Sequence, residues 1–204
     1  MAAARTANKP KPRQRYPRGQ GTMLRDDLIA AAQRLLERTG DEAAVTIRAV
    51  TREAGVAPQS FYLHFPTRDD LLFTLYQQGH DKLHGRLQAA GYAAENADAE
   101  QRLRDICTAY LDFSRDDPAT YQMLMGSVGQ AHDWKELPGA KSYQVIRKAV
   151  ADVRGQSHSR GTTSAAAAVW AQLHGIAELT RKRPTFPWPS TTAMLACVVA
   201  SAKA

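Results

Sequence analysis

The stretch "AGVAPQSFYLHF", residues 54–65, decides how the first part of this 204-residue chain folds. Gly55 interrupts a short helical pattern at a point where a tight turn needs the positive φ that glycine adopts without steric cost. Pro58 then begins a second helix, where its missing N–H has no helical partner to lose. The stretch therefore predicts two short helices joined by a tight turn, the second over about residues 57–63.

Helical patterns continue on both sides of this turn. Thr46 is the predicted N-cap of the helix that precedes it. Downstream, "PTRDDLL", residues 66–72, begins a long helix in which Thr67 and Asp70 have the spacing of a capping box. Upstream, residues 23–36 place apolar side chains on one broad helical face. The pattern predicts a three-helix unit of the helix-turn-helix type, followed by a long fourth helix.

The rest of the sequence also shows the periodicity of helices. Apolar residues recur at helical spacing over residues 103–113, 143–153 and 165–179. No stretch of useful length alternates as a strand does. We therefore expect an all-α fold of about nine helices. The expected organisation is a basic N-terminal arm at residues 1–21, a helix-turn-helix domain at residues 22–80 and a helical domain at residues 81–204.

The positive charge of the chain is concentrated at its N-terminus. The net charge is +7, and residues 1–25 contain seven basic residues and no acidic one, so the remainder is balanced. The prolines and glycines of this arm favour disorder in the free protein. An uncompensated basic arm favours a polyanion such as DNA, RNA or an anionic membrane, or it serves as a solubilising tail.

Several function classes find no support in the sequence. It shows neither a glycine-rich phosphate loop nor a recognisable catalytic triad, so we expect no enzyme and no cofactor. Cys107 and Cys197 lie far apart and are expected to be buried, reduced thiols. His80 and His84 share a helix face without an evident third ligand, so no metal site is expected. Without an apolar run of membrane-spanning length or a secretory signal, a cytoplasmic protein with no membrane partner is expected.

The polar residues of the second short helix suit contact with double-stranded DNA. In a helix-turn-helix this helix enters the major groove with its N-terminal end leading. Gln59 can pair with adenine, Ser60 is less selective, and Tyr62 and His64 are predicted to contact phosphates, although both could instead be surface-packed aromatics. The basic arm could reach a neighbouring minor groove. The predicted DNA contacts are Thr46, Arg48, Pro58, Gln59, Ser60, Tyr62, His64, Thr67 and Arg68.

At this point the segment "TIRAVTREAGVAPQSFYLHFPTRDDLL", residues 46–72, resembles the TetR family of bacterial transcriptional regulators. The similarity extends over roughly residues 23–80 and joins the turn to the aromatic "FYLHF" and the capped "PTRDDLL". Two positions depart from the family pattern. Ala57 stands where Ser or Thr commonly opens the recognition helix, which shifts a phosphate contact to Thr46 or to backbone N–H groups. Thr51 stands where a small alanine is usual, which adjusts the helix crossing.

The second part of the chain is similar to the ligand-binding half of one TetR subgroup. The matching segments are "AYLDFSRDDPATYQMLMG", residues 109–126, and "VWAQLHGIAEL", residues 169–179. The subgroup takes its name from the W-H-G pattern, which here is Trp170, His174 and Gly175. The resemblance implies a homodimer formed through the last two helices, and a cavity among the middle helices. It also implies that an unknown small-molecule effector changes the spacing of two DNA-binding heads.

These observations favour a homodimeric repressor that binds a palindromic operator and is released by the effector. The alternative is a small-molecule-binding helical module without specific DNA binding. For the ligand cavity, apolar and aromatic residues on the middle helices are candidates, although such stripes also form ordinary core. The predicted ligand-binding residues are Ile106, Tyr110, Phe113, Tyr121, Met125, Tyr143, Ile146, Trp170 and His174.

The last two helices have the composition of an interface between subunits. Four consecutive alanines at residues 165–168 permit close helix approach, and large apolar residues supply anchors. The same residues could instead form core within one chain. The predicted interface residues are Val169, Leu173, Ile176, Met194, Leu195 and Val198.

Overall fold

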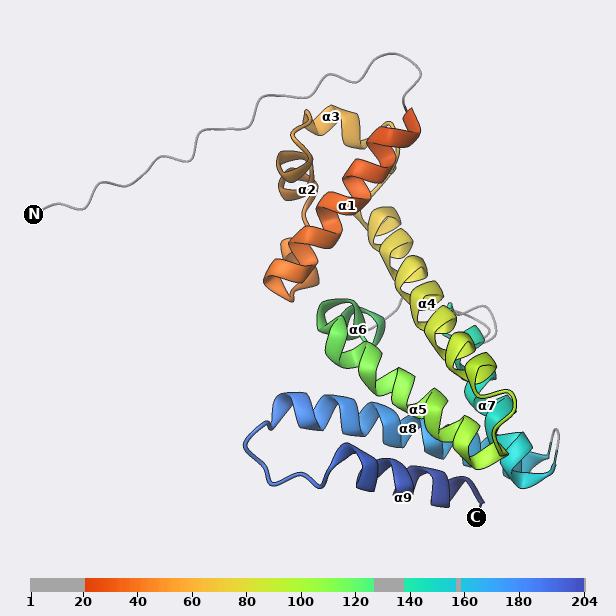
Figure 1. Ribbon diagram of the computed structural model, residues 1–204. Helices are drawn as coiled ribbons and strands as arrows, with labels where there is room; N and C mark the ends of the chain where they lie inside the picture. Colours follow the sequence, from red (N-terminus) through yellow and green to blue (C-terminus); the bar gives the residue numbers. More distant parts are fainter. Residues whose placement is uncertain (1–20, 127–137, 157–158, 204) are drawn as a thin grey trace, which may run out of the picture. The chain divides into compact units, whose positions relative to one another are not determined.

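The computed structural model describes residues 21–126, 138–156 and 159–203 of the chain. Within these ranges it is all-helical and without strands, which confirms the predicted fold class (Figure 1). None of the described helices is long and apolar enough to cross a membrane. The basic arm lies outside the described residues, apart from the start of the first helix. The elements are α1 (Gly21–Thr39), η1 (Glu42–Ala44), α2 (Ile47–Ala54), α3 (Pro58–Phe61), α4 (Arg68–Ala93), α5 (Ala99–Asp116), α6 (Pro118–Leu124), α7 (Ala140–Arg154), α8 (Arg160–Lys182) and α9 (Thr191–Lys203).

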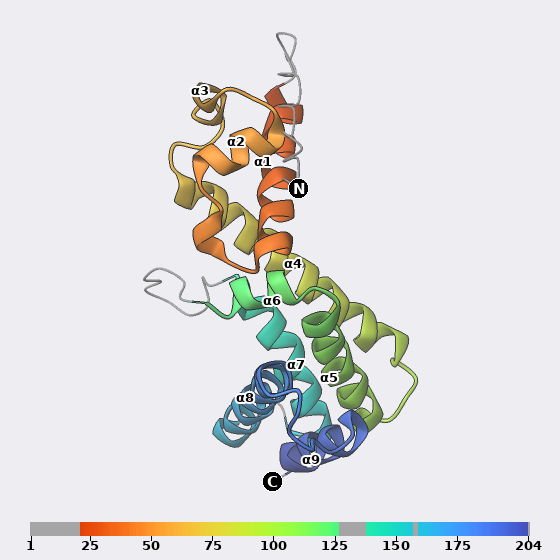
Figure 2. The ribbon, with the colours of Figure 1, turned by 90° about the vertical axis from the view of Figure 1, so that its left-hand side faces the viewer.

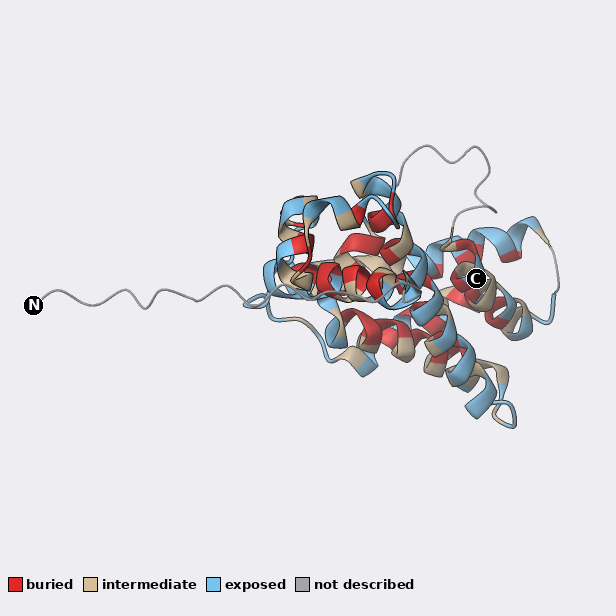
Figure 3. Cartoon of the chain, turned by 90° about the horizontal axis from the view of Figure 1, so that it is seen from above, coloured by how far each residue is buried: buried red, intermediate tan, exposed pale blue. Residues whose placement is uncertain are grey.

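The chain divides into two compact units. The N-terminal unit comprises residues 1–75 and the C-terminal unit residues 76–204, so that the boundary falls within α4. The boundary predicted after residue 80 lies a little further along the same helix. Each unit has its own buried core, and buried residues lie on the inward faces of the helices (Figure 3).

The N-terminal unit consists of α1, α2, α3 and the start of α4. Helix α1 packs against α2, and α2 packs against α3 (Figure 2). The core of the unit contains fully buried side chains from all three helices, namely Leu28, Ala31 and Ala32 of α1, Val50 of α2 and Phe61 of α3. This burial of apolar surface is the main contribution to the stability of the unit.

Charged residues fix α1 against its neighbours at the surface. Glu53 of α2 accepts hydrogen bonds from Arg34 at 3.2 Å and Arg38 at 3.3 Å, both on α1. The hydrogen bond from Arg34 is the main reason that the pKa of the Glu53 carboxyl lies below its ordinary value. At the other end of α1, the Arg25 guanidinium lies 5.0 Å from the centre of the Phe65 ring. These contacts set how α1 lies against the helix-turn-helix.

In the C-terminal unit, α8 packs against α7 and α9, and α5 packs against α7, α8 and α9 (Figure 2). Leu103, Ile146 and Leu173 contribute fully buried side chains from three of these helices. Side chains cap several helix starts, as at α6, where Asp117 accepts from the Thr120 amide at 3.3 Å and Pro118 occupies the first turn.

Two predictions about local structure were wrong in part. Helix α3 ends at Phe61, so residues 62–64 form turns rather than a continued helix. Pro66 disfavours helical backbone at the residue before it, and Phe65 packs inward beside Phe61. Cys107 is buried as predicted, and burial raises the pKa of its thiol to about 12. Cys197 is instead exposed on α9.

Candidate DNA-binding surface and ligand-binding core

The turn between α2 and α3 has the geometry that its sequence predicts. Gly55 has a φ of +72°, in the left-handed region that favours glycine. Its N–H donates to the Arg52 carbonyl at 3.2 Å, and the Val56 N–H donates to the Thr51 carbonyl at 2.9 Å. These two hydrogen bonds end α2 and fix the backbone of the turn that leads into α3. They therefore hold the first residues of α3 in position relative to α2.

Helix α3 and the turns after it direct apolar residues inward and hydrogen-bonding residues outward. Phe61 is 0% exposed and Phe65 is 2% exposed, and their ring centres are 5.6 Å apart. Gln59 is exposed, and Tyr62 is 58% exposed. The two phenylalanines thus anchor the segment in the core, which leaves the polar residues between them free to contact a partner.

The other predicted contacts on α2 and α3 lie at or near the surface. Thr46 is exposed and caps α2, because its hydroxyl accepts a hydrogen bond from the Ala49 amide at 3.2 Å. Arg48 and Pro58 are exposed, whereas Ser60 and His64 are half-buried.

Thr67 has a structural task at the start of α4. Its hydroxyl accepts from the Asp70 amide at 3.2 Å and donates to the Asp70 carboxylate at 2.7 Å. The Thr67 amide donates to the same carboxylate at 2.9 Å. This reciprocal arrangement is the capping box that the sequence predicted. The proton of the Thr67 hydroxyl is therefore already used within the protein.

Arg68 lies in a different environment from the one expected of a phosphate contact. Its Nε donates to the carbonyl of Val45 at 2.8 Å, and its Nη2 donates to the carbonyl of Glu42 at 2.6 Å. The guanidinium thereby ties the start of α4 to the segment that leads into α2. Arg68 therefore positions the motif through these carbonyls, and its contact with a phosphate stays a prediction.

Thr51, one of the two departures from the family pattern, is accommodated inside the unit. The residue is 1% exposed, and its hydroxyl donates to the Ile47 carbonyl at 2.9 Å. Because the buried hydroxyl has a partner one turn earlier in its own helix, it does not carry the cost of an unsatisfied polar group.

In the C-terminal unit, three of the predicted ligand residues form a chain of hydrogen bonds. The hydroxyls of Tyr110 and Tyr121 lie 3.3 Å apart, and the Tyr121 hydroxyl lies 2.8 Å from His174 Nδ1. Both tyrosines are buried and His174 is half-buried. Burial raises the pKa of each tyrosine hydroxyl above its ordinary value, so both remain protonated at neutral pH.

The other six predicted ligand residues are divided between the core and the surface. Ile106, Phe113 and Ile146 are fully buried. Met125, at the end of α6, is half-buried. Tyr143 and Trp170 form an aromatic pair with ring centres 5.8 Å apart, and Trp170 is 43% exposed.

The predicted interface residues lie mainly inside the C-terminal unit. Val169, Leu173, Leu195 and Val198 are buried in its core, whereas Ile176 and Met194 are half-buried. A side chain already buried within one chain has little surface left to bury against another. The exposed faces of the two helices instead present small residues around a few larger ones. These are Ala167, Ala168, Trp170 and Ala171 on α8, and Ala193, Ala196, Cys197 and Ala200 on α9.

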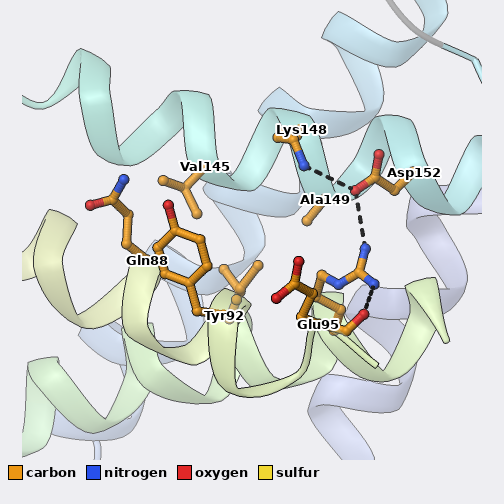
Figure 4. Close-up of a pocket in the computed structure, with 10 residues that line it drawn as sticks. Gln88, Tyr92, Glu95, Val145, Lys148, Ala149 and Asp152 are labelled. Atoms are coloured by element: carbon orange, nitrogen blue, oxygen red, sulfur yellow. Dashed lines mark hydrogen bonds and ion pairs between the residues drawn. The ribbon is translucent and has the colours of Figure 1, made fainter. Parts of the chain in front are cut away.

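A pocket of about 470 Å³ opens in the C-terminal unit between α4, α5 and α7 (Figure 4). Ile106 is the one predicted ligand-binding residue among those that line this pocket. The remaining lining residues were not identified from the sequence. The lining residues are Gln88, Gly91, Tyr92, Glu95, Arg102, Ile106, Val145, Lys148, Ala149 and Asp152.

Comparison with known proteins agrees with these features in both units. Residues 28–75 match the model for bacterial regulatory proteins of the tetR family. Residues 103–201 match the model for the C-terminal domain of tetracyclin repressor-like proteins. The two matched segments together span most of the chain.

Solved structures of similar fold cover nearly the whole chain. A protein of unknown function from Rhodococcus sp. RHA1 is 26% identical, with a TM-score of 0.74, over 93% of this chain and 98% of its own. The fatty acid degradation regulator FadR from Bacillus halodurans is 17% identical, with a TM-score of 0.64, over 92% and 97%. SmeT, solved as a complex with triclosan, is 16% identical, with a TM-score of 0.64, over 88% and 91%.

The fold and the exposed polar helix define a helix-turn-helix transcriptional regulator with a separate helical C-terminal unit. The chain belongs to the TetR family of bacterial regulatory proteins.

Proposed function

We propose that this regulator is a homodimeric repressor that binds a palindromic operator and is released by a small-molecule effector. The observation that carries the DNA-binding part is the exposure of Gln59 and Tyr62 beside the fully buried Phe61. A rigidly held helix that presents hydrogen-bonding groups to solvent can enter the major groove without first being ordered.

Within this proposal the predicted DNA contacts have different tasks. Gln59 pairs with a base edge, and Ser60 and Pro58 lie close to it at the start of α3. Thr46 donates its hydroxyl proton to a phosphate while its oxygen caps α2, and Arg48, Tyr62 and His64 contact the backbone. Thr67 and Arg68 act mainly as positioning residues, because the Thr67 hydroxyl proton and two N–H groups of Arg68 are engaged within the protein.

The proposed test of DNA binding is selection of sites from a random pool of duplexes. We expect enrichment of a palindrome whose half-sites lie about one helical turn apart or a multiple of it. Selection that yields no enriched sequence, with only salt-sensitive binding, would contradict the proposal. That result would favour the alternative, a ligand-binding helical module without specific DNA binding.

For the dimer, we propose that the outer faces of α8 and α9 pack against the same faces of a second copy. The small residues on these faces permit close approach, and Trp170 supplies a large apolar side chain. Ile176 and Met194 remain candidates at its margin, whereas Val169, Leu173, Leu195 and Val198 support the interface from within. A two-fold interface brings each surface against its own counterpart.

The proposed interface predicts that Cys197 of one subunit can be cross-linked to Cys197 of the other. Its exposed thiol on α9 is expected to join its counterpart when the protein is treated with a short bifunctional maleimide. The Cys107→Ser protein should cross-link equally well, because Cys107 is buried and its thiol pKa is raised. The Cys197→Ser protein should not cross-link. A chain that sediments as a monomer at micromolar concentration, with no cross-linked dimer, would contradict the proposed interface.

For the effector, we propose that the hydrogen-bonded chain of Tyr110, Tyr121 and His174 gives the core a polar group with which to orient a mainly apolar ligand. The fold neighbour SmeT was solved as a complex with triclosan, which supports a small-molecule ligand for this protein. We also propose that the C-terminal unit belongs to the W-H-G subgroup. Trp170 and His174 are one helical turn apart on α8, and His174 contacts Tyr121 from α6.

A further inference from the structure

A second pocket, of about 460 Å³, opens in the C-terminal unit where α5 and α8 end and α9 begins. Helices α8 and α9 lie side by side, and the chain turns back between them (Figure 1). Arg115, in the last turn of α5, donates to the hydroxyl of Thr191, the first residue of α9, at 3.4 Å. This pocket shares no lining residue with the pocket of Figure 4, and Tyr110, Tyr121 and His174 do not line it. We call it the arginine pocket.

The inner wall of the arginine pocket is apolar. Leu111 of α5 and Ala177 of α8 are buried, and Met194 of α9 is half-buried. Arg115 lies one helical turn after Leu111, and Arg181 lies one turn after Ala177, so each arginine shares a helix face with an apolar residue of the wall. Both arginines are exposed. The pocket therefore combines an apolar interior with guanidinium groups at its mouth.

The lining of the arginine pocket carries positive charge only. Arg115 and Arg181 are its charged residues, and no acidic residue lines it. Nη2 of Arg115 is paired with Asp112, and Nη2 of Arg181 lies 3.0 Å from the Glu178 carboxylate, so both acids lie outside the lining. Each guanidinium has five N–H donors, and within the described part of the chain neither Nε has a partner. Both arginines therefore keep donors for an acceptor in the pocket.

The hydroxyl groups of the lining differ in whether their protons are already used. Ser114 donates to the Leu111 carbonyl at 2.7 Å, and Thr180 donates to the Ile176 carbonyl at 2.7 Å, each within its own helix. The Thr191 hydroxyl instead accepts a hydrogen bond, and its own proton has no acceptor among the residues that the structure describes. Thr191 can thus donate to an anion beside the arginines.

We propose that the arginine pocket binds a small organic anion, a carboxylate attached to an apolar body. The carboxylate accepts hydrogen bonds from Arg115, Arg181 and Thr191, and charge-assisted bonds of this kind are the stronger ones. The apolar body lies against Leu111 and Ala177. This site is additional to the effector site proposed above, and its occupation does not depend on DNA binding.

The experiment is calorimetric titration of the full chain, without DNA, with three probes of similar shape and different charge. These are 4-phenylbutyrate, the neutral 4-phenylbutan-1-ol and the cationic 4-phenylbutylammonium. We expect phenylbutyrate to bind at least about tenfold more tightly than the other two, because it alone pairs with the arginines. Acetate has the charge without the apolar body and should bind at least about tenfold more weakly than phenylbutyrate.

Variants locate the bound anion. Arg115→Gln and Arg181→Gln each remove one positive charge from an exposed position, so the helix content measured by circular dichroism should not change. Each is expected to weaken binding of phenylbutyrate about tenfold. Arg86→Gln is the matched control, because Arg86 is also ion-paired, with Asp116 at 2.8 Å, but does not line the pocket. It should bind phenylbutyrate as the wild type does.

Equal or tighter binding of the alcohol or the ammonium would overturn the proposal. Phenylbutyrate binding that survives both Arg115→Gln and Arg181→Gln would overturn it, as would an equal loss in Arg86→Gln. Absence of phenylbutyrate binding at millimolar concentration would overturn it as well. That result is expected if a second copy of the chain covers the pocket, since Ile176 and Met194 line it and also lie at the margin of the proposed interface.

Discussion

Replacing Phe61 with alanine is expected to unfold the N-terminal unit under conditions in which the C-terminal unit stays folded. Phe61 is 0% exposed, its helix packs against α2, and its ring lies 5.6 Å from the Phe65 ring. Truncation of a buried phenylalanine costs about 3–5 kcal/mol, which is a large part of the stability of a small domain. Hydrogen exchange should show loss of protection in α1 to α3, and DNA binding should be lost with it.

The neighbouring residue provides the control for this prediction. Tyr62 is 58% exposed, so Tyr62→Ala should change the free energy of unfolding by less than about 1 kcal/mol. Its effect is expected on DNA affinity alone. Equal destabilisation by the two substitutions would mean that the inward and outward residues of this segment are not separated as the structure shows.

The stability of the C-terminal unit is expected to fall as the pH is lowered from 7 to 5, because of His80. The residue is 5% exposed, and neither ring nitrogen has a hydrogen-bond partner among the described residues. Burial lowers the pKa of the imidazole to about 4, whereas in the unfolded chain it is about 6.5. Between these values the unfolded chain binds a proton that the folded chain does not. Stability is therefore lost progressively as the pH falls through 6.5 towards 4.

The expected loss from His80 is about 2 kcal/mol between pH 7 and pH 5, which urea denaturation at the two pH values can measure. The His80→Leu protein should lack this part of the pH dependence. Ser142→Ala removes a buried hydroxyl and no titrating group, so it should keep the pH dependence of the wild type. An identical pH dependence in the wild type and His80→Leu would show that His80 does not titrate as its burial implies.

The helix-turn-helix could be predicted because its signals are local. Gly55, Pro58 and the Thr67–Asp70 pair each determine the backbone within a few residues, and all three behave as expected. The end of α3 could not be predicted in the same way, because it depends on how Phe65 packs. The positioning role of Arg68 could not be predicted either, because the carbonyls that it contacts belong to Glu42 and Val45, more than twenty residues earlier in the sequence.

The C-terminal unit was harder to predict beyond its helical class. Helices α8 and α9 carry apolar or small residues on most of their faces, so periodicity alone did not separate the core face from the outer face. The predicted anchors Val169, Leu173, Leu195 and Val198 face the core. The pocket was missed because Tyr92 and Glu95 form it only when α4, α5 and α7 come together.

The central claim is that α3 determines which DNA sequence this regulator binds, and a base-by-base affinity measurement tests it most directly. The selected operator is varied at each position of one half-site, and binding is measured by fluorescence anisotropy for the wild type and for Gln59→Ala. We predict that Gln59→Ala loses about 1–3 kcal/mol of discrimination at one base pair and keeps it at the others. Discrimination that is unchanged at every position would contradict the claim, because sequence would then be recognised by another part of the chain.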